Sequence, residues 1–444
     1  MKKVLIIYPH FPPSNLAGVH RPRLFVRHLP AYGWEPTVLT VHEKYYEEDP
    51  DWNLVKLLPQ NLRIEKVPAF RLTRPRIFGD IGLRAFFQLY KRAKQLVKDG
   101  KFDFVYIPIP SFYCALLGRL LLHSTGVKYG IDYIDPWVHD FPGSDKKISR
   151  HWFSKQIAKF LEPIAVKKAS LITGVAEGYY KEVLERNPHI KAKVIAEAMP
   201  YGGEQQDHVL LNQLDLKPYL FEKKENRIQL VYAGAMLPKA YGPLEAIFKS
   251  IEANQHLLEG QAGIFGKVEF YFIGTGSRVN DDTSYTIKPL AEKYGLWHTI
   301  VFEYPKRIPY LDVLVHLQIA DGVFILGSTE PHYTPSKVYQ AVLSNKPILG
   351  VLHTSSTASR VITESHSGIV LKFNGEAAVN EITNEFPLVF RRYVSFMEQF
   401  VPGQVDTGYF EQYSADAVTH TLARLLDKVI GEAFNKGDFK SSHE

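Results

Sequence analysis

The segment 334–343, Thr-Pro-Ser-Lys-Val-Tyr-Gln-Ala-Val-Leu, brings together residue types that suit the binding of a phosphate. Thr334 is a good N-cap residue, and Pro335 suits the first position of a helix. We expect this helix to begin in the loop after an apolar strand at 322–326. Its exposed N–H groups, its positive dipole end and the charge of Lys337 would then favour an anion. An ordinary capped surface helix explains the segment about equally well.

The loop 234–243, Gly-Ala-Met-Leu-Pro-Lys-Ala-Tyr-Gly-Pro, is a second phosphate-binding candidate. It follows the apolar strand expected at 227–232. Gly234 permits a ligand to lie close to the backbone, and Lys239 would neutralise a diphosphate leaving group. The loop 274–277, with its pair of glycines, is better explained as a simple turn.

The first half of the chain has its own candidates between the first strand and a helix that begins near His20. Gly18, close to the start of that helix, would let phosphates approach the backbone. His10 and His20 flank the same loop. The competing interpretation is a proline-stiffened loop followed by solvated arginines, Arg21, Arg23 and Arg27.

Two carboxylates, Asp132 and Asp135, are expected at the end of another strand. Carboxylates at such an edge can hold an acceptor hydroxyl or stabilise a developing cation. The alternative is a pair of loop-capping aspartates. We favour a functional role because Trp137 and His139 lie alongside, and aromatic rings suit the faces of sugars.

Two further patterns are interpreted as structural. Asp49-Pro50-Asp51 resembles a metal-binding Asp-x-Asp, but with Glu47 and Glu48 it is expected to form a solvated acidic turn. The basic, amphipathic segment 71–101 places Leu83, Phe87, Tyr90 and Val97 near one stripe, which is more often core packing than a membrane face. Peripheral contact with anionic lipid is the minority alternative.

Composition is typical of a globular protein, with 45% hydrophobic and 13% aromatic residues among 444. The formal net charge of +6 suits an enzyme that handles phosphates or rests on an anionic membrane, and argues little for nucleic acid. The single cysteine, Cys114, excludes an internal disulfide and a cysteine-based zinc site and is typical of a reducing cytosol. The apolar stretch 112–122 is interrupted by Arg119, so no segment is expected to cross a membrane.

Short apolar, β-branched runs alternate with longer helical patterns, which is typical of parallel α/β units. The expected strands are 3–8, 35–41, 62–67, 102–107, 127–132, 171–175, 227–232, 268–273, 299–303, 322–326, 347–351 and 368–371. The pattern stops in the polar stretch 200–226 and then restarts, which predicts two α/β domains, 1–205 and 226–413, with the C-terminal helix 414–444 packing back onto the first. Ligands of such sheets bind beyond the carboxyl ends of the strands, so both domains should contribute loops to a cleft.

Six segments, taken in order and spacing, resemble the GT-B glycosyltransferases of family 4, which retain the anomeric configuration of the transferred sugar. The branch that makes bacterial surface polysaccharide and lipopolysaccharide is the most similar. The segments are 4–18, 132–137, 171–175, 231–242, 320–326 and 335–349. The resemblance implies a GT-B fold, two Rossmann-like domains facing across a cleft, and sugar transfer from a nucleotide-sugar to a hydroxyl.

In such enzymes the regions matching 336–343 and 234–239 hold the donor diphosphate, and the loop matching 304–308 abuts the nucleobase. The implied donor-binding residues are Gly18, Gly234, Lys239, Tyr304, Arg307, His332, Ser336, Lys337 and Gln340. The sequence departs from the family's Glu-x7-Glu pair, because its positions fall on His332 and Gln340, with Glu330 close by. Ala235 replaces the usual arginine of the phosphate loop, so Lys239 is expected to carry more of the phosphate charge.

The expected mechanism has Lys239, Lys337 and the helix N-terminus stabilising the departing diphosphate, while Asp135 and His10 position acceptor or sugar. No metal and no cofactor besides the donor are expected. The expected partners are a nucleotide-sugar and a glycan or lipid-linked acceptor, in the cytoplasm or peripherally at the inner membrane, and not nucleic acid. The alternatives are a non-catalytic nucleotide-binding or partner-binding protein of this fold and a nucleotide-sugar epimerase.

Overall fold

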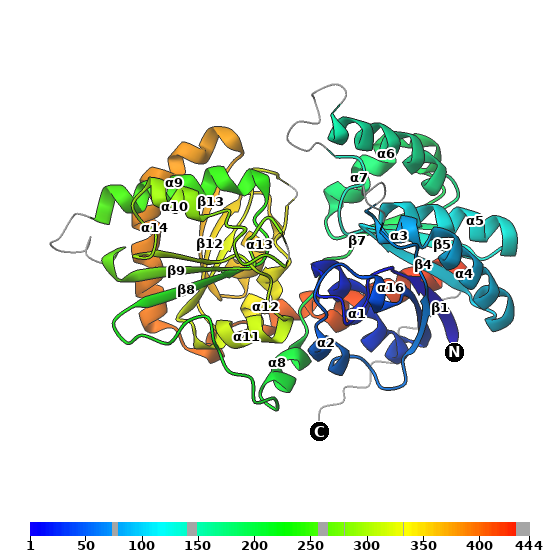
Figure 1. Ribbon diagram of the computed structural model, residues 1–444, viewed down its shortest axis with the longest axis horizontal. Helices are drawn as coiled ribbons and strands as arrows, with labels where there is room; N and C mark the ends of the chain where they lie inside the picture. The colour runs from blue at the N-terminus through cyan, green and yellow to red at the C-terminus, as the bar shows by residue number, and fades with distance from the viewer. Residues whose placement is uncertain (73–78, 140–148, 256–264, 279, 332, 432–444) are drawn as a thin grey trace. The chain divides into compact units, whose positions relative to one another are not determined.

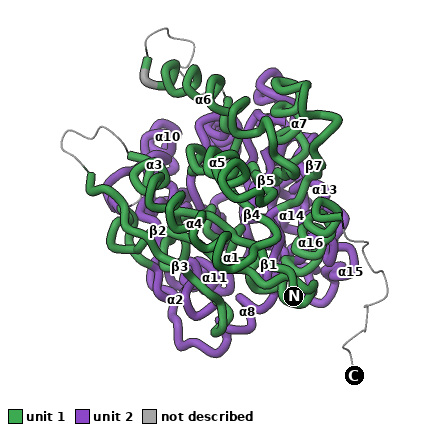
Figure 2. Tube along the Cα trace, turned by 90° about the vertical axis from the view of Figure 1, so that its right-hand side faces the viewer, with its two compact units in different colours: residues 1–50, 58–200, 415–444 green, residues 51–57, 201–414 purple. Residues whose placement is uncertain are grey.

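The computed structural model describes residues 1–72, 79–139, 149–255, 265–278, 280–331 and 333–431. The chain forms two compact units, each built around one parallel β-sheet (Figure 1). Unit 1 comprises residues 1–50, 58–200 and 415–444, and unit 2 comprises residues 51–57 and 201–414 (Figure 2).

The sheet of unit 1 has the order β3-β2-β1-β4-β5-β6-β7. Its strands are β1 (Lys2–Ile7), β2 (Trp34–Val41), β3 (Arg63–Val67), β4 (Phe104–Ile109), β5 (Lys128–Tyr133), β6 (Leu171–Gly174) and β7 (Ile195–Ala198). The first six lie within two residues of their expected ends. Strand β7 was not predicted, because this short, half-buried edge strand, Ile-Ala-Glu-Ala, has no apolar or β-branched run.

Helices cover both faces of this sheet. One core includes the buried sides of α4 (Phe86–Gly100), α5 (Ala115–Thr125) and α6 (Arg150–Val166). The other face packs against α1 (His20–His28) and α16 (Ala415–Ile430). The short α3 (Ile81–Arg84) and α7 (Glu177–Arg186) complete the unit.

The C-terminal helix α16 is held to the first strands by polar contacts as well as by its apolar face. The Asp427 carboxylate accepts hydrogen bonds from Lys2 at 2.5 Å and from the Trp34 indole at 2.8 Å. Tyr32 donates to Asp416 at 2.7 Å. Residues more than 380 positions apart in the chain therefore share one core.

A buried ion pair links α1 to β5. The Arg21 guanidinium donates to both carboxylate oxygens of Asp132, at 2.8 and 3.1 Å, and Thr173 donates to the same carboxylate at 2.7 Å. Arg21 and Asp132 are fully buried, and Arg23 is 2% exposed. The competing interpretation of solvated arginines is therefore wrong for these two. Asp132 is a structural partner of Arg21, neither a loop cap nor a carboxylate free to hold an acceptor.

The sheet of unit 2 has the order β10-β9-β8-β11-β12-β13. Its strands are β8 (Ile228–Ala233), β9 (Val268–Ile273), β10 (Val301–Tyr304), β11 (Gly322–Leu326), β12 (Ile348–His353) and β13 (Gly368–Phe373). Its helices are α2 (Trp52–Lys56), α8 (Gln205–Leu211), α9 (Tyr241–Gln255), α10 (Lys288–Lys293), α11 (Tyr310–Ile319), α12 (Lys337–Leu343), α13 (Thr357–Glu364), α14 (Val379–Gln399) and α15 (Thr407–Phe410). In each sheet the strand order reverses beside the first strand, between β1 and β4 and between β8 and β11, which is where such folds bind ligands.

Within the acidic segment 47–51, Glu47 and Asp49 are exposed as expected, but Asp51 is buried. Asp51 is 3% exposed, caps α2 through the Asn53 N–H at 3.0 Å, and accepts the Tyr310 N–H at 2.8 Å. These contacts attach α2 to α11 within unit 2.

In the part of the chain that the structure describes, no group of three or more His, Cys, Asp or Glu side chains could hold a metal ion. None of the described helices combines the length and the apolar character needed to span a bilayer.

Replacing Asp132 with Ala should lower the free energy of unfolding by about 3–5 kcal/mol, because Arg21 would remain buried without its counter-charge. Urea denaturation at neutral pH measures this loss. Arg63→Ala is the control, since Arg63 is 53% exposed in its 2.8 Å pair with Glu65 and should change stability by less than about 1 kcal/mol. Equal effects of the two substitutions would contradict the structural role of Asp132.

Candidate functional site

Two glycine-containing turns meet at the carboxyl edge of the unit 2 sheet, beside the reversal between β8 and β11. Gly234, at φ +121°, follows β8 and donates its N–H to the Ile273 carbonyl at 2.8 Å. Gly274, at φ +72°, follows β9 and donates to the Tyr304 carbonyl at 2.8 Å. A Cβ at Gly274 would lie 4.0 Å from the Gly234 nitrogen. These left-handed turns strongly favour glycine and keep two backbone segments close together.

The Lys337 side chain reaches this edge from α12. A Cβ at Gly234 would lie only 3.3 Å from the Lys337 Nζ, which itself lies 3.5 Å from the centroid of the Tyr232 ring. The Nζ is shielded from solvent and has no hydrogen-bond partner among the described residues. Desolvation lowers the pKa of Lys337 from an ordinary 10.5 to about 7.

A shielded ammonium without a hydrogen-bond partner is costly, and a cation–π contact offsets only part of its lost hydration. An anion beside Gly234 would supply the missing hydrogen-bond acceptor and counter-charge, with no side chain on the glycine to obstruct it. The arrangement at Gly234, Tyr232 and Lys337 is therefore suited to a phosphate. Gly234 and Lys337 were predicted from the sequence, but Tyr232 was not, because it lies in the apolar run of β8 and looks like an ordinary core residue.

Helix α12 begins later than expected. Its first residue is Lys337 rather than Pro335, and its N-cap is Ser336, not Thr334, without a side-chain capping bond. The Val338 N–H donates to the Pro335 carbonyl at 3.1 Å, an i→i+3 bond, so the chain enters through a tighter turn and the regular helix starts only at Lys337. Because the helix has only 7 residues, the charge of Lys337, rather than a helix dipole, is the main electrostatic feature of this segment.

Lys239 lies on the loop after β8 and forms an ion pair with Glu330 at 3.5 Å. Both side chains are about two-fifths exposed, at 41% and 43%, so the pair is weak and can be exchanged for another partner. The Thr329 N–H donates to the Lys239 carbonyl at 3.2 Å, which joins this loop to the one after β11. Glu330, two residues before the motif position 332, is thus brought to Lys239 by the fold.

The Gln340 side chain contacts His208 of α8, with 2.8 Å between the amide oxygen and Nε2. Burial lowers the pKa of His208, so this imidazole favours its neutral form. The amide oxygen of Gln340 is therefore engaged within unit 2. His332 lies outside the described residues.

The loop 304–308 reaches the same edge through its backbone. The Arg307 Cα would lie 3.7 Å from a Cβ at Gly274. The Tyr304 hydroxyl donates to the Leu220 carbonyl, and its ring stacks at 10° to that of Tyr271. Thr275 and Glu303 are structural: Thr275 donates to the Glu303 carboxylate at 2.8 Å, and that carboxylate also accepts backbone N–H groups at the start of α10.

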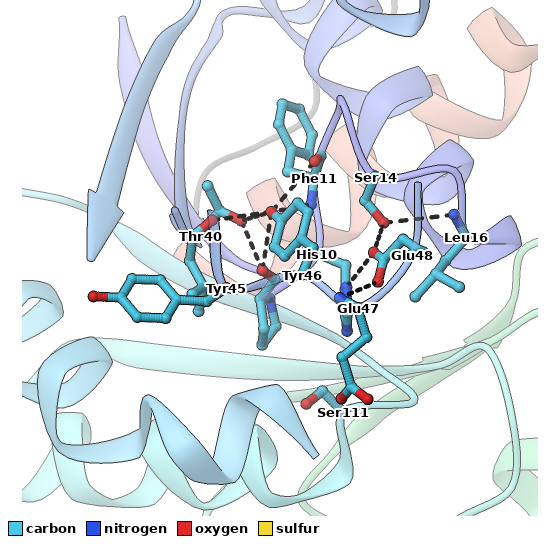
Figure 3. Close-up of polar contacts among 12 residues, drawn as sticks. His10, Phe11, Ser14, Leu16, Thr40, Tyr45, Tyr46, Glu47, Glu48 and Ser111 are labelled. Atoms are coloured by element: carbon cyan, nitrogen blue, oxygen red, sulfur yellow. Dashed lines mark hydrogen bonds and ion pairs between the residues drawn. The ribbon is translucent and has the colours of Figure 1, made fainter. Parts of the chain in front are cut away.

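Unit 1 has a separate polar cluster after β1, shown in Figure 3. The Nδ1 of His10 lies 2.9 Å from the Glu48 carboxylate, and the Ser14 hydroxyl donates to the same oxygen. Although burial alone would raise it, the hydrogen bonds from His10 and Ser14 lower the pKa of Glu48 to about 2. Glu48 is therefore ionised at neutral pH and orients the His10 ring. Its role was missed because it lies in an acidic run that was interpreted as solvated.

The remaining expected residues of unit 1 have different environments. Asp135 is accessible to solvent, yet partial desolvation raises its pKa to about 6. Trp137 is 6% exposed and stacks on Phe112 at 5.9 Å, so the expectation that it receives a sugar face was wrong. A Cβ at Gly18 would lie 2.1 Å from the Tyr8 hydroxyl, which makes this glycine a packing requirement.

The structure thus gathers Gly234 and Lys337, with the Arg307 backbone close to Gly274, at one sheet edge of unit 2. It pairs Lys239 with Glu330 and turns Gln340 towards His208. In unit 1 it holds His10 through Glu48.

Neither a protein-family model nor a curated protein sequence matches the chain significantly. Solved structures do match over nearly the whole chain. A glycosyltransferase from Rickettsia africae is 13% identical, with 97% of this chain and 99% of that chain covered and a TM-score of 0.60. Anabaena HepE in complex with UDP-glucose is 13% identical, with 96% and 100% covered and a TM-score of 0.60. WaaG, a glycosyltransferase involved in lipopolysaccharide biosynthesis, is 12% identical, with 95% and 99% covered and a TM-score of 0.55. The expected fold class is confirmed: two parallel-sheet α/β domains of the GT-B type.

Replacing Lys337 with Met should stabilise the protein at neutral pH by roughly 2 kcal/mol, because the buried charge is removed. With a pKa of about 7 in the folded state and 10.5 ordinarily, the unfolded chain binds more protons between these values. The wild-type penalty is therefore complete below pH 7 and disappears as the pH rises towards 10.5.

Urea denaturation of both proteins across this pH range measures the difference. Lys372→Met, at an exposed position of β13, should change stability little at any pH. A destabilising effect of Lys337→Met at pH 7 would contradict the proposed cost of this ammonium.

Proposed function

We propose that the protein is a glycosyltransferase that binds the diphosphate of a nucleotide-sugar beside Gly234 and Lys337 of unit 2. The observation that carries the proposal is the shielded Lys337 ammonium, which lies close to Gly234 and has no hydrogen-bond partner among the described residues. A diphosphate supplies the negative charge and the oxygen acceptors that this position lacks.

The GT-B type fold supports the choice of ligand, and HepE, of the same fold, has been solved with UDP-glucose. We therefore propose a uridine diphosphate sugar as the first donor to test. The position of Gly234 in the sheet agrees with a nucleotide-sugar ligand, because Gly234 follows β8, the strand beside the reversal of strand order.

In the proposed reaction the bond between the anomeric carbon and the diphosphate oxygen breaks, and the acceptor hydroxyl oxygen forms the new bond to that carbon. Lys337 stabilises the negative charge that develops on the diphosphate. Lys239 joins it by exchanging its weak pair with Glu330 for the phosphate. The departing phosphate oxygen takes the acceptor's proton, and attack from the same face gives retention. The lysines supply the charge stabilisation for which other enzymes use a metal.

We assign the acceptor side of the reaction to unit 1. Glu48 fixes the Nδ1 side of His10, which leaves Nε2 to contact a sugar or acceptor hydroxyl. Asp135, accessible and with a pKa of about 6, is proposed to hold the acceptor. The likeness to WaaG, a glycosyltransferase involved in lipopolysaccharide biosynthesis, supports the proposal of a glycan or lipid-linked acceptor. We propose that the protein acts in the cytoplasm or at the inner face of the membrane.

Affinity for UDP-glucose should be highest below pH 7 and fall as the pH rises above 7, by up to about tenfold per pH unit. The reason is that the bound diphosphate holds Lys337 protonated, whereas the free protein loses that proton near pH 7. Titration calorimetry at several pH values measures this slope.

Lys337→Met should weaken binding by about 10- to 100-fold and remove the slope, because a charge-assisted hydrogen bond is lost. Lys372→Met should retain the wild-type affinity and slope. A wild-type affinity that does not change with pH would contradict the role given to Lys337.

Lys239→Ala should lower turnover of the donor by about a hundredfold, because charge on the leaving group is less stabilised. Release of UDP from UDP-glucose with extracted lipid-linked glycans measures turnover, and NMR of the product gives its anomeric configuration. Lys249→Ala, exposed on the neighbouring helix α9, is the matched control. Near-normal turnover of Lys239→Ala would contradict this assignment.

The same assay with the wild type distinguishes the alternative functions. Epimerisation of the donor sugar in the absence of acceptor would indicate an epimerase, and donor binding without turnover would indicate a non-catalytic protein.

A further inference from the structure

Helix α6 has an apolar stripe on its solvent side. Phe153, Ile157, Phe160 and Ile164 are 50%, 44%, 70% and 42% exposed. Their spacing of four, three and four residues places them on one side of the helix over about 16 Å. The stripe is therefore a continuous apolar surface and not a set of scattered side chains.

The opposite side of the same helix packs into unit 1. Ala158, Ala165 and Val166 belong to the core, at 3%, 0% and 0% exposed. The core needs only this inner side, so the packing of the described residues of unit 1 does not explain the outer stripe. A surface helix ordinarily presents polar residues to water.

The charges that accompany the stripe are basic. Lys159, Lys167 and Lys168 are exposed on α6 or directly after it. The single acidic residue of α6, Glu162, is 1% exposed and bonds the Arg186 guanidinium at 2.9 Å on the inner side. The solvent side thus combines aromatic and aliphatic side chains with positive charge.

The two neighbouring helices extend this character. Helix α4 packs beside α5, and α5 beside α6, and Figure 2 shows them following one another across unit 1. Phe87 on α4 is 72% exposed and Leu120 on α5 is 39% exposed. Lys91 and Lys98 lie one and three turns after Phe87 and are also exposed. The expectation that Phe87 packs in a core stripe was wrong, because Leu89, Ala93 and Leu96 fill that role.

We propose that the outer side of α6, with α4 and α5 beside it, docks on the surface of an anionic lipid bilayer. The apolar stripe would enter the region between head groups and acyl chains, and the lysines would contact lipid phosphates. A second copy of the chain fits less well, because a symmetric pairing of this face would bring its lysines together. The proposal does not depend on the enzymatic activity.

Co-sedimentation of the full chain with vesicles tests the docking. Vesicles of equal parts phosphatidylglycerol and phosphatidylcholine should bind the protein, whereas phosphatidylcholine alone should bind it at least about tenfold less. High salt should weaken binding to the anionic vesicles, because the charge contribution is screened. No binding to anionic vesicles would overturn the proposal.

The double variant Phe153→Ser, Phe160→Ser should bind anionic vesicles at least about tenfold more weakly than the wild type, because two aromatic rings no longer enter the bilayer. Leu388→Ser, at a residue of α14 that is 63% exposed, is the matched control and should bind as the wild type does. Thermal unfolding of both variants should resemble that of the wild type, because the substituted side chains are exposed.

Two outcomes would contradict the assignment of the surface. Unchanged binding of the folded double variant would show that α6 does not enter the bilayer. A wild-type dimer in light scattering that the double variant dissociates, with vesicle binding unaffected, would show that the stripe is covered by a second copy. If the double variant failed to fold, a variant with reversed charges at Lys159, Lys167 and Lys168 serves instead. It should bind anionic vesicles more weakly than the wild type, with no change in binding to phosphatidylcholine vesicles.

Discussion

The ammonium of Lys337 is the feature on which the functional interpretation depends. It lies over the ring of Tyr232 and against Gly234, shielded from water and without a hydrogen bond from the described residues. Its pKa of about 7 expresses the cost of that environment. A charge held at such cost gains most from a ligand that neutralises it, and the position at the reversal of the strand order is where a ligand can do so.

The buried charges of unit 1 provide the contrast. Arg21 and Asp132 are equally removed from water, but each guanidinium and carboxylate group is hydrogen-bonded, and Thr173 completes the carboxylate's contacts. This pair fixes the position of α1 on the sheet and is not available to a substrate. Burial alone therefore does not identify a functional charge; the absence or presence of hydrogen-bond partners distinguishes the two cases.

Unit 1 has two separate features, a polar cluster at the edge of its sheet and an apolar, basic surface on its outer helices. Glu48 and Ser14 orient His10 at one edge of unit 1, while the outer sides of α4, α5 and α6 present apolar and basic groups elsewhere on the unit. Both features arise from loops and helices supported by one parallel sheet. The membrane-docking surface that we propose on these helices would leave unaltered the loops proposed to carry chemistry.

The alternation of apolar strands and helical patterns was sufficient to predict two parallel α/β units, because buried parallel strands require continuous apolar runs. Only β7, short and at an edge, was missed. Gly234 and Lys337 were identified by residue type and by their place after strands. Their proximity, the contact with Tyr232, the ion pair of Lys239 and Glu330, and the bond between Gln340 and His208 depend on packing between segments far apart in the chain. The same holds for Glu48, Trp137 and Phe87, whose exposure was judged wrongly, and for Arg21, whose exposure was left open. A side chain's burial is set by the neighbours that the fold supplies, and local sequence does not contain them.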